Sequence, residues 1–197
     1  YLVQIDKSIA GFIDHPILKA DATPHEIDTV CAEAVQYGFA SVCINPFFVS
    51  RCKHLLEGSP VKVCTVIGFP IGATSTASKT DETAHAIRDG AEKIDMVLHG
   101  GMLKSGNLDY VLDDIAAEVQ TAHSRNAIVK VILESSLLND DEKRTACRLA
   151  QEAGADFVKS STGFSTGGAM EHDIALMRTV VGTSMGVKAS GGIRTLE

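Results

Sequence analysis

The chain contains 197 residues, of which 45% are hydrophobic, and its formal net charge is −7. This length can bury one sizeable core but is short for two ordinary domains, so we expect a single domain spanning residues 1–197. The basic residues are dispersed and residues 1–30 contain no long apolar run, which argues against a nucleic-acid partner, a signal peptide and a membrane span.

Apolar runs alternate along the chain with longer amphipathic segments. The apolar runs predict strands at residues 11–14, 40–44, 61–67, 93–98, 128–133, 157–159 and 186–189. The amphipathic segments predict helices at residues 23–37, 46–56, 79–89, 108–124, 140–153 and 170–181. Thr23 is the expected N-cap of the first of these helices, with Pro24 at its first position and Glu26 at its third. A glycine follows four of the helices, where a left-handed residue can end them: Gly38, Gly90, Gly154 and Gly182.

This alternation predicts an α/β protein in which crossover helices join parallel strands. A doubly wound sheet and a parallel (β/α)8 TIM barrel both fit the pattern, and seven strands favour the barrel. A barrel closed by seven strands would leave two unpaired edges, so we expect an eighth β/α unit that is missing from this sequence.

Five cysteines form no C-x-x-C pair, as is typical of free thiols in a reducing compartment. We therefore expect a cytoplasmic protein.

Charged side chains stand in three of the predicted strands. Asp95 lies inside an apolar run, and Lys159 and Lys188 lie near the ends of two later strands. In a barrel, the residues at the carboxyl ends of strands form the active site. Burying an ammonium group is unfavourable unless it is paired or deprotonated, so two such lysines indicate chemistry. The alternative is that each lysine reaches the barrel rim and pairs with a loop carboxylate.

The chemical interpretation makes one amine a nucleophile and the other the charge that activates it. A second ammonium at about 4 to 5 Å, with an effective dielectric near 20, disfavours protonation by roughly 3 to 4 kcal/mol. Asp95 either neutralises one lysine or also moves protons, and the two roles are compatible.

A polar loop that contains glycine follows each lysine. The loops read Ser160-Ser161-Thr162-Gly163-Phe164 and Ser190-Gly191-Gly192. Glycines let backbone N–H groups turn toward a phosphate, and barrel phosphate sites usually lie after the late strands. We therefore expect Thr162, Gly163, Ser190, Gly191 and Gly192 to bind substrate.

Five segments, in order and spread over most of the chain, resemble the signature segments of deoxyribose-phosphate aldolases, a class I aldolase family. They are SVCINP (41–46), GFPIG (68–72), EKIDMV (92–97), VKSSTGF (158–164) and VKASGGIRT (187–195). The resemblance implies that Lys159 forms an imine, that Lys188 tunes it and that Asp95 belongs to a proton relay. It also implies that Gly163, Gly191 and Gly192 hold the substrate phosphate, and that no metal or organic cofactor is needed.

Two further residues fall at family active-site positions. Asp14 would orient or electrostatically support a lysine. Cys43 would line the pocket, although its residue type alone favours a small core residue over a nucleophile.

The chain departs from the family pattern at two places. Pro16 stands where the family usually has threonine, which removes a hydroxyl and a backbone donor near the pocket. The segment Leu98-His99-Gly100-Gly101 replaces one that more often contains asparagine. His99 either enters the site as an extra polar group or, as we favour, lies in a surface loop.

The resemblance implies reversible cleavage of 2-deoxy-D-ribose 5-phosphate to glyceraldehyde 3-phosphate and acetaldehyde, by a homodimer or homotetramer. One alternative is another Schiff-base barrel aldolase with a different phosphorylated substrate. The other is a barrel that binds a sugar phosphate without catalysis.

Overall fold

The computed structural model of the chain describes residues 7–193. These residues form two compact units, the first made of residues 7–66 and 85–93 and the second of residues 67–84 and 94–193. The expectation of a single domain stays a prediction.

Within the described residues, helices and strands alternate as expected. The strands are β1 (Asp14–Ile17), β2 (Ser41–Ile44), β3 (Lys62–Ile67), β4 (Lys93–Val97), β5 (Ile128–Ile132), β6 (Phe157–Lys159) and β7 (Gly186–Lys188). The α-helices are α1 (Lys7–Ala10), α2 (Pro24–Tyr37), α3 (Val49–Leu55), α4 (Thr76–Asp89), α5 (Gly100–Lys104), α6 (Leu108–His123), α7 (Asp140–Glu152) and α8 (Glu171–Val181), with 3-10 helices η1 (Pro46–Phe48) and η2 (Ser135–Leu137).

The strands pair in parallel, and their order follows the chain. In the first unit β1 pairs with β2 and β2 with β3, and the N–H of Glu92 donates to the carbonyl of Val63 just before β4. In the second unit Leu98, after β4, donates to Ile132 of β5, and β5, β6 and β7 pair in turn. Sequential parallel pairing of this kind requires a crossover between each pair of strands.

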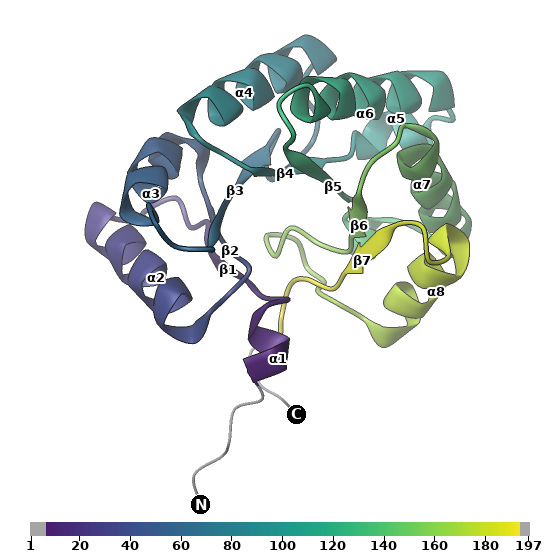
Figure 1. Cartoon of the computed structure of the whole chain (residues 1–197). Coiled ribbons are helices and arrows are strands. Elements are labelled where there is room, and N and C mark those ends of the chain that lie inside the picture. The colour runs from purple at the N-terminus through teal and green to yellow at the C-terminus, as the bar shows by residue number, and fades with distance from the viewer. Residues whose placement is uncertain (1–6, 194–197) are drawn as a thin grey trace, which may run out of the picture. The chain divides into compact units, whose positions relative to one another are not determined.

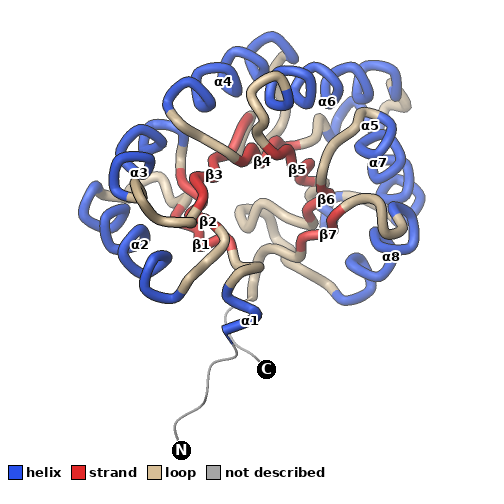
Figure 2. The backbone as a smooth tube through the Cα atoms, in the orientation of Figure 1, coloured by secondary structure: helices blue, strands red, loops and turns tan. Residues whose placement is uncertain are grey.

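The crossover helices cover one face of the strands in each unit. Figure 1 shows α2 and α3 outside β1 to β3, and α6, α7 and α8 outside β5 to β7. Figure 2 separates the strands, drawn in red, from the helices that flank them, drawn in blue. The opposite face of the strands is therefore free of helices within each unit.

Most residues of β4, β5 and β6 are buried. Four of the five residues of β4 and of β5 are buried, as are two of the three in β6. Burial on both faces is characteristic of parallel strands, and it makes any charged side chain within them conspicuous. No helix within residues 7–193 has both the length and the apolar character needed to cross a lipid bilayer.

Helix α2 begins at the predicted N-cap. The Thr23 side chain accepts a hydrogen bond from the N–H of Glu26, whose carboxylate accepts from the N–H of Thr23. Pro24 occupies the first turn, where no helical partner for its missing N–H is needed. The helix ends at Gly38, whose φ of 70° and ψ of 40° lie in the left-handed region. The local signals at both ends of α2 are thus confirmed.

Six of the seven predicted strands are confirmed to within one residue at each end. The first is wrong, because residues 11–13 form a turn closed by hydrogen bonds from Phe12 to Ile9 and from Ile13 to Ala10. The strand runs instead from Asp14 to Ile17 and contains Pro16. Proline cannot donate to a ladder, but Pro16 is exposed in a strand for which β2 is the only partner within its unit, so the missing donor is tolerated.

The predicted helices are present, with two differences at their N-termini. The segment 46–56 begins as η1 before becoming α3, and α4 begins at Thr76 rather than Lys79. The short helices α1, α5 and η2 were not predicted, since fewer than two turns display no measurable periodicity.

Candidate active site

A carboxylate shared by two lysines lies within the buried strands of the second unit. Asp95 of β4 accepts hydrogen bonds from Lys159 Nζ of β6 at 2.7 Å and from Lys130 Nζ of β5 at 2.6 Å, one on each oxygen. Asp95 is fully buried, Lys130 is 2% exposed and Lys159 8%. An isolated charge would be very unfavourable here, so the three groups depend on one another.

Strand geometry brings these side chains to one face. Side chains alternate between faces along a strand, and Ile132 of β5 is the register partner of Lys159. Lys130 therefore projects to the same face as Ile132 and Lys159, one pleat nearer the amino end of its strand. The lysines consequently reach Asp95 from two levels of the sheet.

Lys188 joins this face through β7. It is the register partner of Lys159, and neighbouring strands lie about 4.8 Å apart, so the two lysine side chains leave the sheet side by side. Both end their strands, at the end where barrel active sites form. The expected pair is thus brought together, with Asp95 bonded to Lys159.

The electrostatics of Asp95 are set by its two partners. Burial alone would raise the pKa of this carboxyl, but the neighbouring ammonium groups of Lys130 and Lys159 hold the pKa below its ordinary value. Asp95 is therefore ionised at neutral pH. The amines of Lys130, Lys159 and Lys188 come from adjacent strands on this face, and Asp95 accepts from the first two.

Lys130 is a member of the cluster that sequence reasoning missed. It stands in the middle of the apolar run Ile128–Ile132, and the argument that singled out Lys159 applies to it equally. The sequence therefore marks Lys130 in the same way as Asp95, as a charged residue inside an apolar run.

The loops after β6 and β7 are held together by two serines. The hydroxyl of Ser160 donates to the carbonyl of Ser190 at 3.1 Å and accepts from its N–H at 3.0 Å. The hydroxyl of Ser190 donates to the carbonyl of Ser161 at 2.6 Å and accepts from its N–H at 3.1 Å. The predicted phosphate loops are therefore one connected structure next to the lysines.

Glycine is required where these loops meet. Gly191 has a φ of 86°, and a Cβ there would lie 3.1 Å from the Cα of Gly168 and 3.3 Å from the Cβ of Ser161. Gly163 and Gly192 also have positive φ values, of 84° and 78°. Within residues 7–193, no acceptor is bonded to the N–H of Gly163, Gly191 or Gly192. These donors could therefore serve an anion.

The loop after β6 is also held by Glu134, which lies two residues after the end of β5. Glu134 accepts hydrogen bonds from both the hydroxyl and the N–H of Thr162. The ring of Phe164 packs edge-on against Phe69, with ring centroids 5.2 Å apart. Thr162, predicted to bind substrate, is thus held by a buried carboxylate that the sequence analysis did not single out.

Asp14 lies in the first unit, at the amino end of β1. Its carboxylate accepts from the hydroxyl of Ser41 and from Lys93 Nζ at 3.0 Å. Its lysine partner is Lys93, at the amino end of β4, and the expected active-site role of Asp14 stays a prediction. Residues at the amino end of a barrel strand usually serve stability rather than catalysis.

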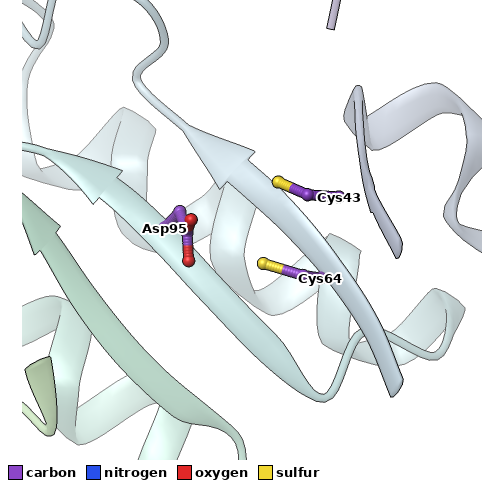
Figure 3. Close-up of side chains that lie close together, drawn as sticks. All are labelled: Cys43, Cys64 and Asp95. Atoms are coloured by element: carbon purple, nitrogen blue, oxygen red, sulfur yellow. The ribbon is translucent and has the colours of Figure 1, made fainter. Parts of the chain in front are cut away.

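Cys43 is a buried residue of β2, 2% exposed, and the register partner of Cys64 on β3. Figure 3 shows the two sulfur atoms carried by these neighbouring strands. All five cysteines are buried and free.

The two departures from the family pattern have distinct structural roles. His99 caps helix α5: its Nδ1 accepts from the N–H of Met102 at 3.4 Å, and its ring packs edge-on against Tyr110. Pro16 is exposed and sits opposite Cys43 in the register of β1 and β2. Arg194 and Thr195, at the end of the last signature segment, lie outside the described residues.

One group in the second unit has the spacing of metal ligands: Asp140, His172 and Asp173. Lys143 Nζ already pairs with Asp173 at 2.7 Å and with Asp140 at 3.3 Å. The ammonium occupies the place of a cation, so we assign no metal to these residues.

Comparison with known proteins agrees with this geometry. A family model described as DeoC/LacD family aldolase matches residues 9–197. A deoxyribose-phosphate aldolase of Lysinibacillus sphaericus (strain C3-41) is 57% identical over 193 residues, which are 98% of this chain and 86% of the relative.

Two solved structures extend the likeness to the fold. A Coccidioides immitis protein described as a deoxyribose-phosphate aldolase is 46% identical with a TM-score of 0.92, over 95% of this chain and 75% of that one. The tetrameric deoxyribose phosphate aldolase of Aeropyrum pernix is 34% identical with a TM-score of 0.89, over 96% and 80%. The predicted fold class, a parallel (β/α)8 barrel with seven strands in this sequence, is confirmed. Strand order, the lysine cluster and these likenesses agree, and the chain belongs to the DeoC/LacD aldolase family.

Proposed function

We propose that this chain catalyses the reversible cleavage of 2-deoxy-D-ribose 5-phosphate to D-glyceraldehyde 3-phosphate and acetaldehyde through an imine on Lys159. The observation that carries the proposal is the carboxylate of Asp95 shared between Lys159 and Lys130, in a chain of this aldolase family. Members of the family with this activity are more than 50% identical to the chain.

The amine of Lys159 must be neutral to attack a carbonyl carbon. Lys130, Lys159 and Lys188 bring three amines to adjacent strands on one face, and repulsion among three ammonium groups disfavours full protonation of all three. Loss of one ammonium proton relieves that repulsion. Lys188 is the neighbour in register and supplies a charge close to Lys159.

The chemistry then proceeds in balanced steps. The amine adds to the aldehyde carbon C1, and water leaves to give an iminium. A base removes the proton of the C3 hydroxyl, the C2–C3 bond breaks, and its electron pair forms an enamine while glyceraldehyde 3-phosphate departs. Protonation at C2 and addition of water release acetaldehyde and restore the lysine. Asp95 is the buried group bonded to Lys159, and we assign it to the proton relay.

The substrate phosphate binds at the joined loops after β6 and β7. The backbone donors of Gly163, Gly191 and Gly192 and the side chains of Thr162 and Ser190 lie in these loops. Backbone N–H groups in such turns recognise an anion without a long cationic side chain.

Chemical trapping tests the proposal. Borohydride added with acetaldehyde should reduce the imine and leave an ethyl group on Lys159, located by peptide mass spectrometry. Lys93, which also pairs with an aspartate, serves as an internal control and should stay unmodified. Lys159→Ala should abolish both trapping and turnover. An unmodified Lys159 would instead favour a barrel that binds a sugar phosphate without catalysis.

Substrate profiling addresses the other alternative, a Schiff-base aldolase with a different phosphorylated substrate. Acetaldehyde should be the efficient donor in the synthetic direction. Preference for a different donor would assign the same imine chemistry to another reaction.

We also propose that the enzyme is a cytoplasmic homo-oligomer, either a dimer or a tetramer, without a nucleic-acid partner. Five buried free cysteines suit a reducing compartment, and the net charge of −7 disfavours binding to a polyanion. The relative of Aeropyrum pernix is a tetramer.

A further inference from the structure

Glu134, two residues after the end of β5, has an unusual backbone conformation. Its φ of 54° and ψ of 62° lie in the left-handed region, and Asn126 is the only other residue besides glycine with positive φ within residues 7–193. Asparagine tolerates this region, whereas a glutamate in it is strained. A strained residue at the carboxyl end of a barrel strand suggests that its side chain is needed at that place.

The carboxylate of Glu134 organises the phosphate loop through one threonine. Its Oε2 accepts from the hydroxyl and the N–H of Thr162. Because the single hydroxyl proton of Thr162 goes to the carboxylate, the hydroxyl oxygen accepts from the N–H of Phe164, at 3.1 Å. The chain of bonds spans Gly163 on both sides and so determines the orientation of its N–H.

The surroundings of Glu134 contain unsatisfied polar atoms. Glu134 Oε1, Ser135 Oγ and Ser161 Oγ are buried and have no hydrogen-bond partner within the described residues. All three belong to the segments that follow β5 and β6, and the N–H of Ser135 donates to the carbonyl of Ser160. Buried polar atoms without partners are costly, and their concentration beside a proposed ligand loop fits a site completed by substrate.

From these observations we propose that Glu134 is a positioning residue that sets the phosphate loop through Thr162 and so makes the enzyme selective for phosphorylated substrates. The inference rests on the proposed function. It adds a residue from the segment after β5 to a site otherwise built from the segments after β6 and β7.

The test compares Glu134→Gln with the wild type on 2-deoxyribose 5-phosphate and on 2-deoxyribose. The amide keeps the shape but loses the charge-assisted hydrogen bond, so we expect KM for the phosphorylated substrate to rise about tenfold. The value of kcat/KM for the unphosphorylated sugar should change by less than about twofold. Inhibition by inorganic phosphate should weaken by the same factor as KM rises.

A matched control is present in the same unit. Glu118 is also buried, accepts from a threonine hydroxyl through Oε2, and has an unpartnered Oε1 among the described residues, but it lies on α6. Glu118→Gln should leave KM and phosphate inhibition unchanged. A comparable rise of KM in this variant would assign the effect to any loss of a buried carboxylate and overturn the proposal.

Two further measurements test the hydrogen bond of Thr162 and separate the role of Glu134 from the proposed function. Thr162→Val should raise KM as Glu134→Gln does, and Thr162→Ser should restore it, so the hydrogen bond is testable even if Glu134→Gln fails to fold. Borohydride trapping of acetaldehyde on Glu134→Gln should match the wild type, since acetaldehyde carries no phosphate. If Glu134→Gln lost kcat/KM equally on both sugars and kept its inhibition by phosphate, the proposed role of Glu134 would be overturned. If the wild type showed no trapping, the proposed function would be overturned instead.

Discussion

At the scale of single residues, we propose that the charges around Asp95 control the protonation of Lys159. One carboxylate accepts from both Lys130 and Lys159, while Lys188 stands next to Lys159 in register. The neutral amine required for attack thus arises from three competing amines rather than from two. Each of the two supporting lysines should contribute to keeping Lys159 unprotonated.

Removing either supporting charge should shift the dependence of the rate on pH. Lys188→Leu and Lys130→Met each delete one ammonium, so Lys159 regains its proton more readily and activity near neutral pH should fall, by about tenfold or more. The profile of kcat/KM against pH should move to higher pH in both variants. Lys104→Met, which removes an exposed lysine paired with Glu142, is the control and should leave the profile unchanged. A profile that keeps its position in the Lys188 variant would contradict the tuning role.

At the scale of elements, local hydrogen bonds fix the helix termini, and non-local hydrogen bonds fix the loops of the site. Helix α2 starts with a reciprocal capping box, and α7 has the same arrangement with Asn139 and Glu142. The loops after β6 and β7 depend instead on contacts between segments distant in sequence, such as those of Ser160 with Ser190. Local bonds set the elements, and non-local bonds set the site.

The capping box of α2 gives a stability prediction at this scale. Thr23→Ala removes the side chain that accepts from the N–H of Glu26 and should lower the free energy of unfolding by about 1 kcal/mol. Urea denaturation measures the change. Thr29→Ala is a matched control on the same helix, because its exposed hydroxyl only bonds back to the carbonyl of His25, and it should be neutral within about 0.5 kcal/mol. Equal losses in the two variants would show that the cap contributes nothing specific.

At the scale of the whole molecule, stability should depend on pH through buried carboxyls of opposite behaviour. Burial raises the pKa of Glu118 to about 7, outweighing the hydrogen bond from Thr83. Asp95 has a lowered pKa in the folded chain. It therefore stabilises the fold at pH values above the ordinary pKa of an aspartate, and this contribution is lost only in acid.

Glu118 determines whether stability rises or falls with pH in the neutral range. Its pKa is higher in the folded chain than in the unfolded one, so the folded chain binds more protons between about pH 4.5 and 7, and stability falls as pH rises through that window. The loss amounts to about 3 kcal/mol by pH 7.5. Denaturation series at pH 5, 6, 7 and 7.5 should show this decline in the wild type and a flatter curve in Glu118→Gln. Parallel curves for the two proteins would mean that Glu118 does not titrate as inferred.

Much of the fold was determined by the sequence alone, because its signals are local. Apolar runs of β-branched residues placed six strands to within one residue, and Thr23, Pro24 and Gly38 marked both ends of α2. The first strand was misplaced. The observed strand contains Pro16, and whether a proline is tolerated in a strand depends on a neighbouring strand that the local sequence does not reveal. The lysine pair could be found because charge in a buried strand is recognisable in one dimension.

Only the tertiary structure decided which charges meet. The sequence predicted that Lys159 acts with Asp95, and a lysine within an apolar run marked Lys130 as unusual without revealing its partner. Lys130 is 29 residues before Lys159 and comes within 2.6 Å of Asp95 because β5 lies between β4 and β6. In the same way Glu134 reaches Thr162 across 28 residues, and Asp14 bonds Lys93 across 79. Hydrogen bonds act over about 3 Å, and distances that short between residues so far apart along the chain exist only after the strands have paired.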